Sequence, residues 1–215
     1  MSLDGLATAL GLGDSAQPIL DTLSSLYADL DAEIARRASG LGLPCRAGCD
    51  ACCHESVFVS APEVLAVFAY LLEHRTPEEL FALVEQMRAL ALEFADELEL
   101  LETIEPGDER DEVAARVKFR CPLLGSSGAC TIYPARELNG RTFGQAWDRK
   151  KGGAYGCTLT HARLAVLPPE DGPQMIDARD ARARLAALVP GTERVHVYPW
   201  WFARHGELLL RQRTA

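Results

Sequence analysis

Apolar side chains recur at three- and four-residue spacing along several stretches of the chain, and this spacing is typical of amphipathic helices. It predicts helices over 16–38, 61–74 and 77–103. Weaker periodicity predicts a short helix within 133–150 and a last helix over 178–189. We expect the apolar faces of these helices to pack together as the core.

Two of these helices have clear start signals in the sequence. Residues 60–63 (Ser-Ala-Pro-Glu) form a capping box, in which the serine and glutamate side chains bind backbone amides of the first turn. Residues 76–79 (Thr-Pro-Glu-Glu) repeat the pattern, with proline at the first helical position. Both helices should therefore begin at these residues.

Extended structure is predicted for two short segments. One is the β-branched run 56–60, and the other is the tail 194–201, where Pro199 would confine a strand to a sheet edge. The predicted fold class is mostly α: a compact helical domain with a loop-borne cysteine cluster and little β.

The length of 215 residues suits one domain. Within it we distinguish an N-terminal helix region (1–40), a cysteine-cluster metal-binding domain (41–160) and a C-terminal helix and short strand (161–215) that pack on the same domain.

The charge distribution limits the classes of partner. The net charge is −9, which argues against a nucleic-acid partner. The stretch 93–112 holds ten acidic residues and one arginine, and we interpret it as a solvated helix face rather than a surface for cations or basic partners. The N-terminus lacks a signal-peptide pattern, and no run of eighteen apolar residues occurs. We therefore expect a cytoplasmic protein without a membrane partner, and leave a protein partner open.

The seven cysteines carry the most specific chemical signal. Four of them fall within nine residues and three follow later: Cys45, Cys49, Cys52, Cys53, Cys121, Cys130 and Cys157. An odd number excludes a fully disulfide-paired monomer, and cytosolic thiols stay reduced. Thiolates bind soft and borderline metals. The pattern therefore predicts a metal site built from cysteine thiolates.

The number of thiols leaves the arrangement open. Both a helix and a loop over 45–53 would bring the sulfurs together. A tetrahedral ion takes four ligands at about 2.3 Å, and adjacent cysteines rarely share one ion. Cys52 and Cys53 therefore face two metals, or one of them stays free. Seven thiols exceed one site and fall one short of two, which implies a shared ligand, a non-cysteine ligand or an open coordination position.

Histidines are weaker candidates. His54 and His161 lie close to cysteines in the sequence and are either ligands, neighbours of ligands or exposed loop residues. The other three histidines have less support: His74, His196 and His205. The pair Trp200-Trp201 is interpreted as packing or as a partner surface.

The cysteine motifs resemble those of a known family. The run Cys-x3-Cys-x2-Cys-Cys at 45–53, then Val-Phe-Val-Ser at 57–60, Cys-Pro-Leu at 121–123 and Cys-Thr-Ile-Tyr at 130–133 resemble the CxxCxxCC family of YkgJ-type cysteine-cluster proteins. Its members are described as zinc- or iron-chelating; some are labelled iron–sulfur oxidoreductases, and flagellin lysine-N-methylases carry a related cluster. The resemblance covers roughly 41–157 and implies metal binding by the seven cysteines, with catalytic residues unknown.

The chain departs from the family pattern after the second motif. That motif typically continues Ile-Tyr-x-x-Arg-Pro-x-x-Cys-Arg. Arg136 and Arg141 match it, whereas Glu137 stands in the proline position and Gly140 in the cysteine position. Cys157 matches the last family cysteine, so seven of eight expected thiols remain. The missing thiol either leaves an open coordination position at which a metal can react, or marks a metal site that has fewer ligands than in the family.

Three other functions have weaker support. The spacing of Cys45, Cys49 and Cys52 also matches the three-cysteine signature of radical S-adenosylmethionine enzymes. The sequence lacks the alternating strands that their barrel requires. S-adenosylmethionine-linked protein lysine N-methylation is suggested by the flagellin relatives, without a glycine-rich cofactor loop. A structural-zinc interaction module is the third alternative, although the helices suffice to build a core.

Overall fold

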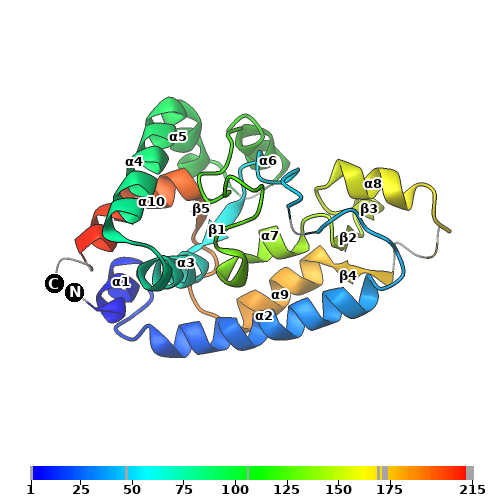
Figure 1. Cartoon of the computed structure of the whole chain (residues 1–215), viewed down its shortest axis with the longest axis horizontal. Helices are drawn as coiled ribbons and strands as arrows, with labels where there is room; N and C mark the ends of the chain where they lie inside the picture. The colour runs from blue at the N-terminus through cyan, green and yellow to red at the C-terminus, as the bar shows by residue number, and fades with distance from the viewer. Residues whose placement is uncertain (1, 47, 106, 169, 171–173, 212–215) are drawn as a thin grey trace.

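The structure is a computed structural model, which describes residues 2–46, 48–105, 107–168, 170 and 174–211 (Figure 1). Its helices are α1 (Leu3–Ala9), α2 (Gln17–Arg37), α3 (Ala61–His74), α4 (Pro77–Glu93), α5 (Ala95–Thr103), α6 (Asp108–Ala114), the 3-10 turn Tyr133–Ala135, α7 (Leu138–Thr142), α8 (Thr158–Leu164), α9 (Ala178–Leu188) and α10 (Tyr198–Arg211). Its strands are β1 (Phe58–Ser60), β2 (Ala146–Asp148), β3 (Gly153–Ala154), β4 (Ile176–Asp177) and β5 (Val195–Val197). The fold is mostly α with little β, as predicted.

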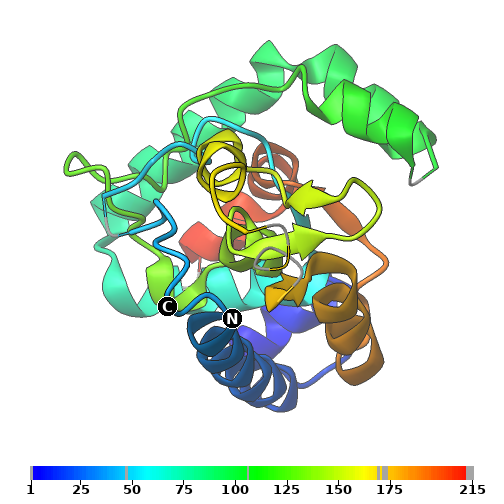
Figure 2. The same cartoon turned by 90° about the vertical axis from the view of Figure 1, so that its right-hand side faces the viewer.

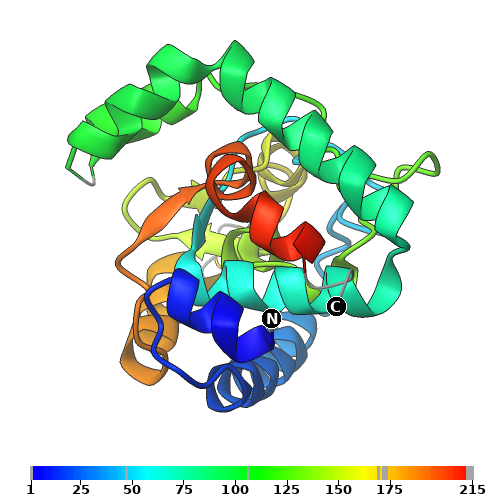
Figure 3. The ribbon, with the colours of Figure 1, turned by 90° about the vertical axis from the view of Figure 1, so that its left-hand side faces the viewer.

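The main core lies between α3, α4 and α10, and α1 packs on the same side (Figure 3). Phe68 and Phe202 meet edge to face there, with ring centroids 5.0 Å apart. Trp201 is fully buried and donates a 2.9 Å hydrogen bond from its indole to the carbonyl of Val59. The tryptophan pair therefore includes one true core residue. Along one edge of the molecule α2 lies beside α9 (Figure 1).

The capping boxes at α3 and α4 are confirmed. In the first, the Glu63 carboxylate accepts from the Ser60 amide at 2.9 Å and the Ser60 hydroxyl at 2.6 Å. The same carboxylate accepts from the Tyr27 hydroxyl at 2.6 Å and the Leu138 amide at 2.7 Å. Glu63 is 4% exposed, and these four donors join α2, α3 and α7.

Two small sheets complete the fold. β1 pairs antiparallel with β5, so that Phe58 faces Val197 and Ser60 faces Val195. β2 forms a hairpin with β3 and pairs in parallel with β4 (Figure 2). The strand expected over 194–201 is confirmed in its first half only. Pro199 lies in the first turn of α10, where a missing amide costs no helical hydrogen bond.

The single helix predicted over 77–103 is wrong. The helix breaks at Phe94, whose φ of −107° and ψ of 31° end α4 before α5 begins. The break redirects Leu98 and Leu101 onto a small second core with Val113 and Val197. Val113 and Ala114 of this cluster belong to α6. This helix was not predicted from the acidic stretch of the sequence. Most acidic side chains of the 93–112 stretch are exposed, as expected for a solvated face.

Two further expectations need correction. Within 133–150 the helical structure is limited to the 3-10 turn and α7, because the chain turns at Gly144, whose φ is +71°, and enters β2. The helix over 178–189 is found as α9, but it is followed by α10. The turn expected at 168–173 lies largely outside the described residues. No described helix has both the length and the apolar character needed to cross a bilayer.

Candidate metal centre

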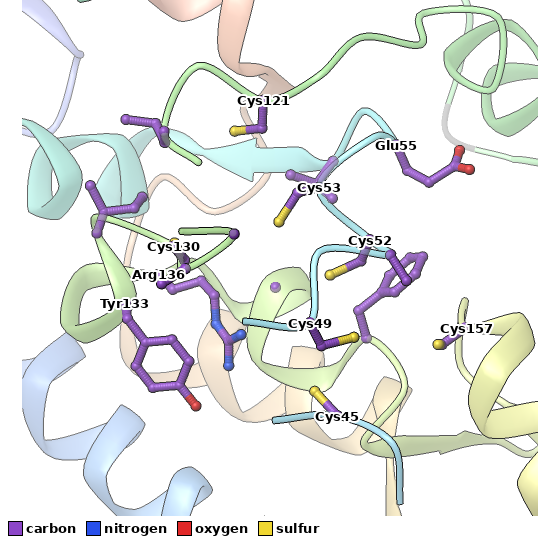
Figure 4. Close-up of a pocket in the computed structure, with 18 of the residues that line it drawn as sticks. Cys45, Cys49, Cys52, Cys53, Glu55, Cys121, Cys130, Tyr133, Arg136 and Cys157 are labelled. Carbon is purple, nitrogen blue, oxygen red and sulfur yellow. The ribbon is translucent and has the colours of Figure 1, made fainter. Parts of the chain in front are cut away.

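All seven cysteines line one pocket of about 470 Å³, here called the thiol pocket (Figure 4). They are free thiols, and each is partly buried. They come from three segments of the chain: the loop before β1, the loop before the 3-10 turn, and the start of α8. The fold therefore brings together every cysteine that the sequence singled out.

The described residues of the first segment, 45–46 and 48–53, fold as a loop with turns rather than as a helix. The Cys49 amide donates to the Arg46 carbonyl at 2.9 Å, and the Cys53 amide donates to the Asp50 carbonyl at 2.8 Å. Gly48 has a φ of +84°, in the left-handed region that favours glycine. Of the two geometries considered for this segment, the structure has the loop.

The second segment is tied to the first by its backbone. The Cys121 amide donates to the Cys53 carbonyl at 2.8 Å. Cys130 forms a β-bridge with Leu124, which returns it to the same loop. In Figure 4, Cys121 and Cys130 lie on the Cys53 side of the thiol pocket. We call Cys53, Cys121 and Cys130 the inner group.

The remaining thiols lie on the other side. Cys45 and Cys49 are close together in Figure 4, and Cys157 approaches from the start of α8. A Cβ atom built on Gly144 would lie 2.8 Å from the Cβ of Cys157, so the glycine permits this approach. We call Cys45, Cys49 and Cys157 the outer group. Cys52 lies between the two groups.

The electrostatics of the thiols agree with this division. Burial raises the pKa of Cys45, and the neighbouring thiols that add to the rise are Cys52, Cys49 and Cys157. Burial likewise raises the pKa of Cys121 to about 12 and raises the pKa of Cys130. A hydrogen bond from Cys53 lowers the pKa of Cys52 to about 7, and the same bond raises the pKa of Cys53. Of the pair Cys52 and Cys53, Cys52 is therefore the first to ionise.

Arg136 brings a positive charge to the thiol pocket. Its guanidinium lies 4.4 Å from the centre of the Tyr133 ring and points into the pocket (Figure 4). Its buried Nε has no hydrogen-bond partner, and among the described residues no carboxylate forms an ion pair with it. An unpaired cation in this position suits an anionic occupant, such as a metal bound by several thiolates.

Arg141, which is 3% exposed, stabilises the turn that carries Arg136. Arg141 donates to the carbonyls of Arg136 and Pro134, both at 2.7 Å, and forms an ion pair with Asp31. Its guanidinium also lies 4.3 Å from the centre of the Tyr27 ring. This arginine therefore fixes one wall of the thiol pocket.

Two further residues line the thiol pocket but were not predicted from the sequence as site residues. Glu137 is buried, and its Oε2 accepts a 2.6 Å hydrogen bond from the Tyr198 hydroxyl. Burial raises the pKa of Glu137, while the Tyr198 hydroxyl and its own backbone amide act in the opposite direction. The sequence did offer one signal for Glu137, since it stands where the family pattern has proline. Tyr198 is distant in sequence and gave none.

The histidines are not brought into the thiol pocket. His54 is exposed, with Nε2 3.7 Å from the Asp50 carboxylate, and His161 lies against Gly153. The others pack against aromatic rings elsewhere: His74 on Tyr70, His196 on Trp200, and His205 beside Trp201. Within the described ranges, no three His, Cys, Asp or Glu side chains are spaced as they stand to hold a metal ion.

The fold and the pocket define a mostly α protein with a thiol-lined cavity. Comparisons with protein-family models, with curated proteins and with solved structures gave no match. The resemblance to the cysteine-cluster family accordingly stays a prediction, and the functional argument rests on the thiol pocket itself.

Proposed function

We propose that this protein binds zinc or iron through cysteine thiolates in the thiol pocket. The observation that carries the proposal is the convergence of seven free thiols from three separate segments on one cavity. Cysteines that serve only as small core residues would be packed against apolar neighbours. Cys121 and Cys130 do pack against the main core, but all seven cysteines also border one open cavity beside a cation, Arg136. Thiolates are strong ligands for zinc and iron.

The size of the thiol pocket favours more than one metal ion. Its volume of about 470 Å³ is far larger than the roughly 30 Å³ that one water molecule occupies in the liquid. A single ion would leave most of that space unused. Two ions or an iron–sulfur cluster would use more of it, and the cysteine loops would have to draw inward to reach bonding distance. A redox or metal-handling role in the cytoplasm, where thiols stay reduced, follows from this proposal.

Anaerobic purification without a metal-binding tag, followed by elemental analysis, tests the proposal. Iron with acid-labile sulfide and visible charge-transfer absorption is the result expected for a cluster. Colourless protein with stoichiometric zinc is the result expected for thiolate-bound zinc. A chain that carries neither metal, and takes up neither when supplied with it under reducing conditions, would overturn the proposal.

A matched pair of variants localises any bound metal. Cys52→Ser removes the central thiol and should lower metal content strongly. Ser56→Ala changes a nearby hydroxyl that donates to the Ala114 carbonyl at 2.7 Å and does not line the thiol pocket. It should retain the wild-type metal content. Equal losses in both variants would point to general unfolding rather than to loss of a ligand.

A further inference from the structure

We propose that the Glu137 carboxylate is an oxygen ligand in the thiol pocket and completes a set of eight donors with the seven thiols. This inference rests on the proposed metal binding. It concerns one residue that lies immediately before α7 and lines the same cavity as all seven cysteines, and whose charge acts on Cys52, Cys121 and Cys130.

The Glu137 carboxylate accepts few hydrogen bonds: one from the Tyr198 hydroxyl and one from its own backbone amide. Oε2 accepts from the Tyr198 hydroxyl at 2.6 Å, and among the described residues no other side chain donates to this group. Nor does any described Lys, Arg or His form an ion pair with it. Glu63 is equally buried, at 4% exposure, yet its two oxygens receive four hydrogen bonds. Buried carboxylates are as a rule paired or bound to a metal, and Glu137 has no such ion pair among the described residues, although the charge of Arg136 acts on it.

The other carboxylate oxygen, Oε1, lies close to Gly140. A Cβ atom at residue 140 would lie 2.6 Å from Oε1 of Glu137 and 2.7 Å from Cγ of Arg136. The carboxylate therefore fills the space that any side chain at residue 140 would need. Because seven thiols are one short of two four-coordinate sites, Glu137 is suitably placed to supply the eighth donor.

The hydrogen bond from Tyr198 fits this role. Carboxylates that bind metals are usually oriented by a hydrogen bond to the oxygen that does not coordinate. Tyr198 is itself buried, in the first turn of α10, so its hydroxyl holds the Glu137 carboxylate in one orientation. A mixed sulfur and oxygen donor set also suits zinc and iron better than the softer cuprous ion.

X-ray absorption at the edge of the metal that the purified protein carries tests the inference without any mutation. We expect an oxygen shell at about 2.0–2.2 Å beside the sulfur shell at about 2.3 Å. Glu137→Gln keeps the shape and can still accept from Tyr198, and it should lose the oxygen shell and weaken metal binding about tenfold or more. Glu137→Cys should retain the metal with sulfur alone.

Glu63→Gln is the control, since it alters an equally buried carboxylate outside the thiol pocket. It should leave the oxygen shell and metal content unchanged in protein that folds, as judged by circular dichroism. An all-sulfur shell in wild-type protein, or an unchanged oxygen shell in Glu137→Gln, would overturn the role of Glu137 and leave thiolate metal binding intact. Wild-type protein that binds no metal would overturn both proposals.

Discussion

The backbone amide of Cys121 donates a 2.8 Å hydrogen bond to the carbonyl oxygen of Cys53. This bond joins the two cysteine loops through their main chains and does not depend on either sulfur. The inner group of thiols is therefore brought together by the fold itself. A metal bound there would meet ligands whose loops are already adjacent, which lowers the entropy lost on binding.

The inner and outer groups predict a division of the bound metal. Cys53→Ser and Cys130→Ser each remove one inner-group thiol, so both should lower the metal content by the same amount. The double variant should lose little more than either single one, because both thiols serve one metal. Cys45→Ser, in the outer group, should remove a different part of the metal. Elemental analysis of each anaerobically purified variant measures these losses.

The central position of Cys52 allows its variant to be compared with that of the neighbouring Cys53. Cys52 lies between the groups, so Cys52→Ser should reduce metal content more than Cys53→Ser although the two residues are neighbours. Complete loss of metal from every single variant would instead indicate one cluster shared by all the thiols, and would refute the division into two groups.

Gly144 should be more sensitive to substitution than Gly152, although both have positive φ values, +71° and +66°. A Cβ atom on Gly144 would lie 2.8 Å from the Cβ of Cys157, whereas one on Gly152 would meet nothing within 4 Å. Gly152→Ala should cost about 1 kcal/mol of unfolding free energy from backbone strain alone. Gly144→Ala should cost about 2–3 kcal/mol, because the Cys157 side chain must also move.

Urea denaturation of the two glycine variants measures the difference. The same proteins should differ in metal content, with Gly144→Ala losing metal because Cys157 is displaced and Gly152→Ala retaining it. Similar stability and similar metal content in both variants would show that the contact between Gly144 and Cys157 does not position that thiol.

Arg136 should stabilise a thiolate complex through its charge. Arg136→Gln removes the positive charge that points into the thiol pocket, and it should weaken metal binding by about 1–2 kcal/mol. Arg136→Lys should recover part of that loss, since a lysine retains the charge but not the planar contact with Tyr133. Arg149→Gln alters an exposed arginine outside the pocket and serves as the control. Competition with a chelator measures the affinities, and equal affinities for the wild-type and Arg136→Gln proteins would contradict this role.

The elements with strong local signals could be predicted from the sequence. The capping boxes fix the starts of α3 and α4, and the periodic apolar residues fix α2 to within one residue at each end. The break at Phe94 could not be predicted, because the apolar stripe continues through it. Its cause is tertiary: Leu98 and Leu101 pack against Val113 of the next helix and against Val197, which comes from a distant part of the chain.

The candidate site shows the same limit. The cysteines were recognisable by their type and number, and their meeting in one cavity depends on long-range contacts such as that between Cys53 and Cys121. Glu137 looked like a simple departure from a family motif. Its importance depends on burial, on Tyr198 and on the backbone of Gly140, and none of these is visible in local sequence.

Stability should fall as the pH drops below neutrality, because His196 is held neutral in the folded chain. Burial, together with the nearby Arg110 charge, lowers the pKa of His196 to about 4. Its ring stacks on Trp200, with centroids 3.7 Å apart. In the unfolded chain the pKa returns to about 6.5, so between these values the unfolded state binds more protons. The stabilisation is complete above about pH 6.5 and is lost as the pH falls towards 4.

The expected loss is about 1–2 kcal/mol, since partial exposure of the ring reduces the full effect of the shift. Urea denaturation at a series of pH values from 7 to 4 measures it. His196→Gln should make the profile less steep in this range, because the substituted side chain binds no proton. His205, whose pKa is also lowered by burial, should retain part of the slope. An unchanged slope in His196→Gln would show that another group causes the acid sensitivity.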